Sequence, residues 1–117
     1  LFLIFIFTAE MKTETKEKKA ELNLDVQQLK KGSLVIRALK HKLRQQMLKL
    51  IHDKGPIAVT DIYVKLRIEQ SVASQHLAIL RKPRIVTTVR EGKKIYYSID
   101  YNRLAEINSM MESLLKK

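Results

Sequence analysis

One segment, residues 68–82 (IEQSVASQHLAILRK), restricts the fold of this chain more than any other. Its small and apolar side chains Ala73, Leu77 and Leu80 recur at steps of four and three residues, which places them on one face of a predicted helix. The opposite face lacks the Glu and Lys residues typical of a solvated surface helix and instead carries short polar side chains, namely Ser71, Ser74, Gln75 and His76. Such side chains suit base edges and phosphate oxygens in a major groove. The segment therefore predicts a helix that presents a hydrogen-bonding face to a partner.

A basic turn and a predicted hairpin follow this helix. Pro83 ends the helix, because the residue before a proline, here Lys82, favours extended backbone. Two short runs with strand character then flank residues 90–94 (REGKK), a hairpin turn marked by its glycine; their apolar members are Ile85, Val86, Val89, Ile95, Tyr97 and Ile99. Of Tyr96 and Tyr97, one should pack in the core and the other should face outward. Helix, basic turn and basic hairpin together predict a winged helix-turn-helix, a mainly α fold with a small β-hairpin.

The charge of the chain indicates a polyanionic partner. Its 117 residues make one domain, and a hydrophobic fraction of 45% is enough for a modest core. The formal net charge of +11 favours nucleic acid, or less commonly an anionic membrane surface. Residues 26–52 contain no acid, and their bases are Lys30, Lys31, Arg37, Lys40, Lys42, Arg44 and Lys49. The chain has no cysteine, which excludes disulfides and thiolate metal sites and is compatible with the cytoplasm.

The N-terminal residues differ in composition from the rest of the chain. Residues 1–7 (LFLIFIF) form an apolar run that is too short to span a bilayer, which needs about 20 residues. No basic residue precedes the run, so a secretory signal is not expected. We expect residues 1–10 to be an upstream extension, with a docking strand or membrane anchor as the alternative. Adding the charged segment that follows, we expect residues 1–21 to be a partly disordered extension and 22–117 to be the folded domain.

Helical periodicity organises the remainder of that domain. Gly32 and Ser33 predict a break with Ser33 as the N-cap of the next helix. That helix has the most regular apolar spacing in the chain, at Ile36, Leu39, Leu43, Met47, Leu50 and Ile51. Gly55 and Pro56 end it, and Thr60 or Asp61 is expected to cap a short helix over residues 62–66. A terminal amphipathic helix is predicted from Leu104, Ile107, Met111, Leu114 and Leu115.

Three blocks of this sequence resemble the ArsR-type (arsenic-repressor) family of winged-helix regulators. Residues 38–48 (ALKHKLRQQML) are similar to the family's opening block, which has the pattern ALxHPxRxxIL. Residues 68–80 (IEQSVASQHLAIL) resemble its recognition segment, LSQSTVSQHLxxL. Residues 80–86 (LRKPRIV) and 90–98 (REGKKIYYS) resemble its wing. The matched blocks cover roughly residues 36–100.

The resemblance implies a homodimeric repressor that binds double-stranded DNA in the cytoplasm. It implies that the first and last helices form the dimer interface, for which we name Leu104, Ile107, Met111 and Leu114. The DNA-binding set that we expect combines matched recognition and wing positions with neighbouring bases; it is Gln70, Ser71, Ser74, Gln75, His76, Arg81, Arg90, Lys93 and Lys94. For His76, a hydrogen bond within the fold is an equally weighted alternative.

The departures from the family pattern concern metals and turns. The cysteine triplet of the metal-sensing branch is replaced by residues 58–60 (AVT), and the last helix has no histidine, so we expect no metal site and no cofactor. Arg67 and Arg84 stand where the family prefers glycine, which predicts backbone strain of about 1 kcal/mol at one or both turns. Glu69 replaces a serine and should weaken the cap of the recognition helix.

Two other classes of function remain to be separated from DNA binding. One is a basic membrane-surface protein that uses residues 1–7, although we expect no membrane partner. The other is a protein-interaction module that keeps the winged-helix fold without specific DNA binding. We expect no enzyme, because no nucleophile–base pair, carboxylate dyad, metal cluster or phosphate loop can be assembled from these residues.

Overall fold

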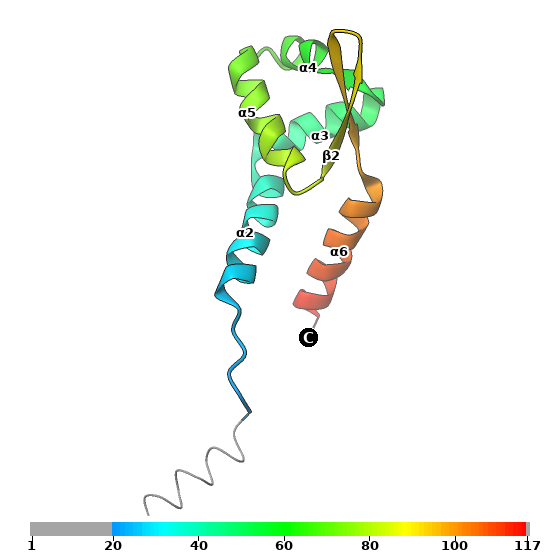
Figure 1. The fold of residues 1–117 in the computed structure, drawn as a ribbon. Helices are drawn as coiled ribbons and strands as arrows, with labels where there is room; N and C mark the ends of the chain where they lie inside the picture. Colours follow the sequence, from blue (N-terminus) through cyan, green and yellow to red (C-terminus); the bar gives the residue numbers. More distant parts are fainter. Residues whose placement is uncertain (1–19, 117) are drawn as a thin grey trace, which may run out of the picture.

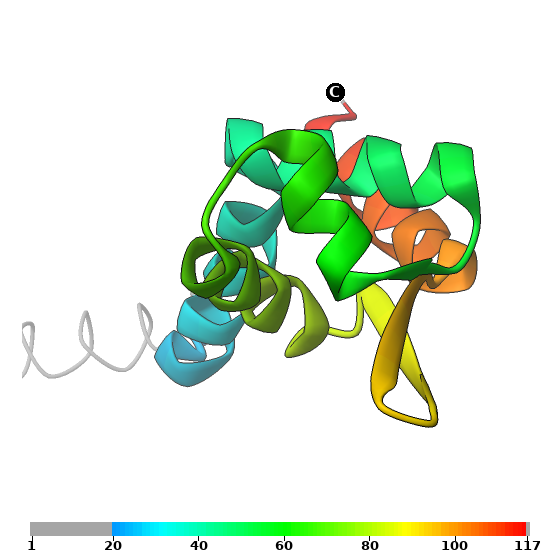
Figure 2. The same cartoon turned by 90° about the horizontal axis from the view of Figure 1, so that it is seen from above.

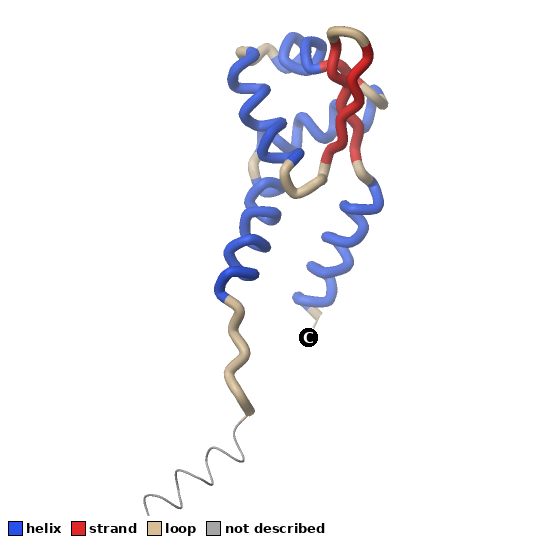
Figure 3. The backbone as a smooth tube through the Cα atoms, in the orientation of Figure 1, coloured by secondary structure: helices blue, strands red, loops and turns tan. Residues whose placement is uncertain are grey.

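The computed structural model describes residues 20–116, so the predictions for residues 1–7 and for most of the charged segment after them lie outside the described residues. The elements in chain order are α2 (Val26–Lys40), α3 (Lys42–Lys54), β1 (Ile57–Ala58), α4 (Val59–Leu66), α5 (Gln70–Arg81), β2 (Val86–Glu91), β3 (Lys94–Ile99) and α6 (Tyr101–Leu115). In Figure 1, α3, α4, α5 and the sheet form a head, from which α2 and α6 extend in the same direction. Figure 3 shows that helices dominate and that the strands are confined to one small sheet. The predicted fold class, mainly α with a winged helix-turn-helix, is confirmed.

Helix α2 runs through the position where a break was predicted. It begins at Val26, because the Asp25 carboxylate accepts a hydrogen bond from the backbone N–H of Gln28 at 3.0 Å. The prediction of Ser33 as an N-cap is therefore wrong. The Ser33 hydroxyl instead donates to the carbonyl of Lys30 at 2.8 Å, within the helix. A glycine inside a helix costs only about 1 kcal/mol relative to alanine, which a capped helix of 15 residues tolerates.

The break lies at His41, inside the stretch that was expected to be one continuous helix. His41 has extended backbone, and its Nδ1 accepts from the N–H of Leu43 at 3.2 Å to cap α3. Two side chains of α3 reach back to the last turn of α2. Arg44 Nε donates to the carbonyl of Ala38 at 2.9 Å, and Gln45 Nε2 donates to the carbonyl of Leu39 at 2.8 Å. Side-chain caps on both helices therefore fix a corner that apolar spacing alone does not reveal.

The sheet has one more strand than the sequence predicts. Strand β1 pairs antiparallel with β3, Ile57 opposite Tyr97 and Ala58 opposite Tyr96, which gives the strand order β1-β3-β2. Helix α4 starts directly after β1, with Ala58 as an N-cap that makes no side-chain hydrogen bond, so the expected cap by Thr60 or Asp61 is wrong. A strand of two residues has no periodicity of its own and is defined only by its pairing.

The core lies where α3, α4, α5 and the sheet meet. Its largest fully buried side chains are Met47, Ile51, Ile62, Leu77, Leu80, Ile85 and Val86. The predicted inner face of the recognition helix, which consists of Ala73, Leu77 and Leu80, is fully buried and confirmed. Of the two adjacent tyrosines, Tyr97 is buried in this core and Tyr96 is only half-buried, as the alternation of a strand requires.

Candidate nucleic-acid interface

The turn between α4 and α5 sets the direction of the recognition helix α5. Arg67 ends α4 in the left-handed region, with φ 56° and ψ 46°, and its N–H bonds to the carbonyl of Val64 at 3.2 Å. The N–H of Ile68 then donates to the carbonyl of Tyr63 at 3.0 Å, which closes the helix end. Arg67 therefore places a residue with a Cβ in the left-handed region, where such residues are disfavoured, which supports the prediction of strain at this turn.

The exposed face of α5 carries four of the predicted DNA-binding side chains, Gln70, Ser71, Ser74 and Gln75. Glu69 is the N-cap of this helix and its carboxylate caps no backbone N–H, so the expected weak cap is confirmed. Because the inner face of α5 is fixed in the core, these polar side chains project from a rigid support. In Figure 2, α5 and the hairpin of β2 and β3 lie on the same side of the domain, and α3 lies on the opposite side.

His76 differs from its neighbours, because its ring is partly buried and has a partner in the fold. Its Nδ1 lies 3.2 Å from Nη1 of Arg44, and its ring centroid lies 4.7 Å from that of His41. Burial, with smaller contributions from His41 and Arg44, lowers the pKa of His76 below its ordinary value. The intramolecular hydrogen bond that was weighed for His76 is therefore present.

The turn after α5 presents three exposed cations, Arg81, Lys82 and Arg84. The expectation of extended backbone at Lys82 is wrong, since it keeps helical angles (φ −56°, ψ −48°) and donates to the carbonyl of Ala78. That hydrogen bond compensates for the steric pressure from Pro83. The chain reverses instead at Arg84, which has φ 63° and donates to the carbonyl of Arg81 at 2.9 Å. Arg84 is thus the second of the two predicted turn positions that adopts a left-handed backbone.

The wing is the two-stranded hairpin of β2 and β3. Its strands pair from Val86 opposite Ile99 to Glu91 opposite Lys94, and Gly92 turns the chain with φ 62°. Arg90, Lys93 and Lys94 are all exposed near the tip, whereas Val86 and Tyr97 anchor the base of the hairpin in the core. The hairpin therefore holds cations beyond the body of the domain, on the same side as α5.

The four residues predicted for the dimer interface occupy different environments on α6. Ile107 is only 6% exposed and belongs to the core of the single chain, and Leu104 packs against that core. Met111 is half-buried, whereas Leu114 is 72% exposed. Met110, which was not named from the sequence, is 67% exposed. Its helical spacing to Leu114, four residues, was the signal that could have identified it.

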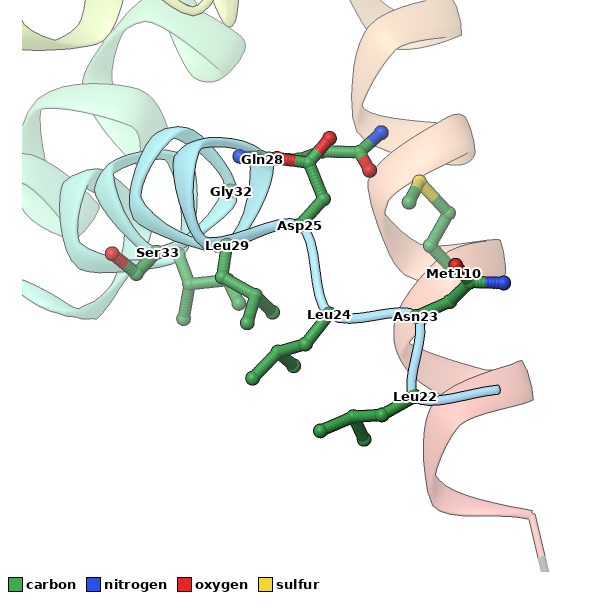
Figure 4. Close-up of a pocket in the computed structure, with 10 residues that line it drawn as sticks. Leu22, Asn23, Leu24, Asp25, Gln28, Leu29, Gly32, Ser33 and Met110 are labelled. Carbon is green, nitrogen blue, oxygen red and sulfur yellow. Dashed lines mark hydrogen bonds between the residues drawn. The ribbon is translucent and has the colours of Figure 1, made fainter. Parts of the chain in front are cut away.

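An open apolar groove lies between the start of α2 and α6. Figure 4 shows Leu22, Leu24 and Leu29 from the N-terminal side and Met110 from α6 around it. Leu22, Leu24 and Leu29 are more than half exposed, although each is a large hydrophobic side chain. Together these side chains form a continuous exposed apolar patch, which single scattered leucines on a surface do not form.

The described residues contain neither a metal-binding cluster nor a membrane-spanning helix. Within residues 20–116, no group of three or more His, Cys, Asp or Glu side chains is arranged to hold a metal ion. None of the helices in that range is both long and apolar enough to cross a membrane.

The comparisons with known proteins agree on one family. The sequence model described as "Bacterial regulatory protein, arsR family" matches residues 41–88. The transcriptional activator HlyU of Vibrio cholerae is 31% identical over 83% of this chain and 88% of its own length. A biofilm growth-associated repressor of Agrobacterium fabrum is 33% identical over 64% of this chain and 63% of its own length.

A solved structure supports the same assignment. The homodimeric winged helix-turn-helix DNA-binding domain from Mycobacterium bovis superposes with a TM-score of 0.61 at 27% identity, over 84% of this chain and 94% of that one. Its match extends beyond the recognition segment to nearly the whole described domain. The chain therefore belongs to the ArsR family of bacterial regulatory proteins and is a transcriptional regulator of the winged helix-turn-helix type.

Proposed function

We propose that this regulator binds specific sequences of double-stranded DNA as a homodimer, with α5 in the major groove and the wing on phosphates or in the minor groove. The observation that carries the proposal is the placement of two chemically different surfaces on one side of the domain. One is the polar, uncharged face of α5 that ends in Gln75, and the other is the cationic tip of the wing with Lys93 and Lys94. Short polar groups can read bases, whereas cations mainly contact the backbone.

The charge distribution supports DNA over an acidic protein as the partner. The net charge of +11 provides general attraction to a polyanion. Arg81, Lys82 and Arg84 follow α5 directly and are exposed, so cations adjoin the polar face as well as the wing. We assign base contacts to Gln70, Ser71, Ser74, Gln75 and His76, and phosphate or minor-groove contacts to Arg81, Arg90, Lys93 and Lys94.

The homodimer is supported by the apolar groove between α2 and α6. Leu22, Leu24, Leu29, Met110 and Leu114 leave a large apolar area exposed in the single chain. The similar Mycobacterium bovis domain is described as homodimeric. We propose that a second copy covers this surface, with Ile107 supporting it from the core.

Repression is the direction of regulation that we propose, with the cytoplasm as the place of action. A bound dimer that occupies a promoter blocks transcription without further machinery. The relatives include both an activator and a repressor, so the direction is a property to be measured on a reporter gene.

The experiment that tests the proposal is selection of bound duplexes from a random DNA library by the full chain. The selected duplex and a scrambled duplex of the same composition are then compared by fluorescence anisotropy at a fixed salt concentration. We expect a selected sequence with two-fold symmetry and an affinity about 10³-fold or more above that for the scrambled duplex. Equal affinities for both duplexes would contradict sequence-specific binding.

A further inference from the structure

Arg44 is a buried cation that makes three side-chain hydrogen bonds, two to carbonyls of α2 and one to His76. It is 5% exposed, although it lies on the first turn of α3. Nε and Nη2 donate to the carbonyls of Ala38 and Arg37, at 2.9 and 3.2 Å, and Nη1 faces Nδ1 of His76 at 3.2 Å. The two carbonyls lie in the last turn of α2, where the negative end of the helix dipole offsets the buried charge.

The contact with His76 determines the protonation of that ring. A guanidinium has only donors, so Nδ1 of His76 must be the acceptor. In the neutral ring the proton then resides on Nε2, and Nε2 has no hydrogen-bond partner among the described residues. Nε2 is not a buried atom without a partner, so Nε2–H is available as a donor on the helix that also carries the exposed side chains of Ser74 and Gln75.

The groups around the ring favour this neutral state. Arg44 approaches the ring from α3, and His41 approaches it from the corner between α2 and α3. Burial and the charges of these two residues lower the pKa of His76, and no carboxylate of the described residues is hydrogen-bonded to the ring. A proton on Nδ1 would replace a hydrogen bond with a contact between two cations.

We infer that Arg44 is a positioning residue for DNA recognition: it links α5 to the α2–α3 corner and fixes His76 so that Nε2–H is the group offered to a hydrogen-bond acceptor on DNA. The inference rests on the proposed function and deepens it. Arg44 itself is too buried to contact DNA and acts through His76. The acceptor is a base-edge atom such as N7 of a purine or a phosphate oxygen, which share this chemistry.

The first test is spectroscopic and needs no DNA. In ¹⁵N-detected spectra of the full chain at pH 7.5, His76 should have a protonated Nε2 and an unprotonated Nδ1. In the Arg44→Lys variant, which loses the planar arrangement of donors, both tautomers should be populated. Observation of a protonated Nδ1 in the unsubstituted protein would overturn the inference, whatever the DNA experiments show.

The second test uses two substitutions at His76 that separate its nitrogens. His76→Asn keeps an acceptor near the Nδ1 position, so the fold should be stable while discrimination between selected and scrambled duplexes falls about fivefold per half-site, the value of one hydrogen bond. His76→Gln places its amide near the Nε2 position, so it should retain more discrimination but lower the melting temperature. The opposite pattern would overturn the inference.

The third test is a double-mutant cycle with a matched control. Arg44→Lys should reduce discrimination about fivefold per half-site in the unsubstituted protein but have little further effect in His76→Asn. Gln45→Ala also removes a side-chain cap from the end of α2, at Leu39, without touching His76, and it should leave discrimination unchanged. Additive losses in the cycle, or an equal loss with Gln45→Ala, would show a merely structural role for Arg44.

Two further experiments identify the acceptor on DNA and show whether the proposed function or only this inference fails. Replacing single purines of the selected duplex by 7-deaza analogues removes N7, whereas methylphosphonates remove phosphate charge. The modification that removes the acceptor of His76 should make the affinity for that duplex insensitive to His76→Asn. If neither modification has this effect, the contact between His76 and DNA is contradicted. If the unsubstituted protein does not discriminate between duplexes at all, the proposed function fails. If it does discriminate and Arg44→Lys leaves the ratio intact, only this inference fails.

Discussion

Arg67 and Arg84 both adopt left-handed backbone, with φ values of 56° and 63°, and they stand on either side of the recognition helix α5. Arg67 ends the preceding helix and Arg84 reverses the chain into the wing. The two residues therefore set where α5 begins and how the wing leaves it. Both conformations are ones that glycine adopts without a steric cost.

Replacing either arginine by glycine should stabilise the fold. We expect Arg67→Gly and Arg84→Gly each to raise the free energy of unfolding by about 0.5–1 kcal/mol, because relief of left-handed strain exceeds the entropy that glycine adds to the unfolded chain. Urea denaturation followed by circular dichroism measures this. Lys65→Gly, in the last turn of α4, is the control and should destabilise by about 0.5–1 kcal/mol, because this residue has right-handed helical backbone. A loss of stability in both arginine variants would show that neither turn is strained.

The stability of the fold should depend on pH through His76. The pKa of this ring is lowered in the folded protein by burial first and by the charges of His41 and Arg44 second, from an ordinary value of 6.5. Between the lowered pKa and 6.5 the unfolded chain binds more protons, so stability rises with pH in that window. The contribution is fully present above 6.5 and is lost as the pH falls through the folded pKa.

Thermal unfolding of the unsubstituted protein and His76→Asn between pH 5 and pH 8 measures this dependence. We expect the difference in stability between the two proteins to change in favour of the asparagine variant as the pH falls. Parallel curves across the whole range would contradict a titrating contact between His76 and Arg44.

Substitutions can distinguish the proposed dimer surface of α6 from the residues that α6 contributes to the core. Leu114→Lys and Met110→Lys alter exposed apolar side chains and should give folded monomers in sedimentation experiments. Ile107→Lys should instead unfold the chain, because a buried charge without a partner costs several kcal/mol. Ser109→Lys, on the opposite face of α6 by helical spacing, is the control and should remain dimeric. Dimers that persist in both exposed-face variants would place the interface elsewhere.

Soft metals should not release this protein from DNA. The chain has no cysteine, and cadmium and arsenite bind proteins chiefly through thiolates. We expect the anisotropy titration of the selected duplex to be unchanged by either one at micromolar concentration. Release that persists with a freshly desalted protein and is reversed by a chelator would contradict this.

The recognition helix and the wing could be predicted from the sequence because their signals are local. The spacing of Ala73, Leu77 and Leu80 determines the buried face, and the glycine in residues 90–94 determines the hairpin turn. The corner at His41 could not be predicted, since the apolar spacing continues through it. It is fixed by Arg44 and Gln45, which cap α2 from the next helix.

Two other features depend on tertiary contacts that the sequence pattern does not contain. Strand β1 exists only through its pairing with β3. Ile107 follows the same apolar spacing as Leu114, but α6 buries the first against the domain and leaves the second exposed. Spacing identifies the apolar face of a helix, whereas the position of the helix on the domain decides which residues of that face remain available for a partner.

The roles of the two exposed surfaces predict different salt dependences. Lys93→Ala and Lys94→Ala should weaken binding to selected and scrambled duplexes about equally. Each should also reduce the slope of log affinity against log salt by about 0.9 per contact, doubled in a symmetric dimer. Lys116→Ala, at the far end of α6, is the control and should leave the slope unchanged.

The most direct test of specific recognition by α5 is the effect of Gln75→Ala on the selected and the scrambled duplex, measured at several salt concentrations beside Gln46→Ala, an exposed glutamine of α3. Gln75→Ala should cost about 1–3 kcal/mol on the selected duplex and almost nothing on the scrambled one, with an unchanged salt slope, and Gln46→Ala should cost nothing on either. Gln75→Ala could instead weaken binding to both duplexes equally, while the wing variants lose only discrimination between them. That result would contradict the assignment of base recognition to α5 and of backbone binding to the wing.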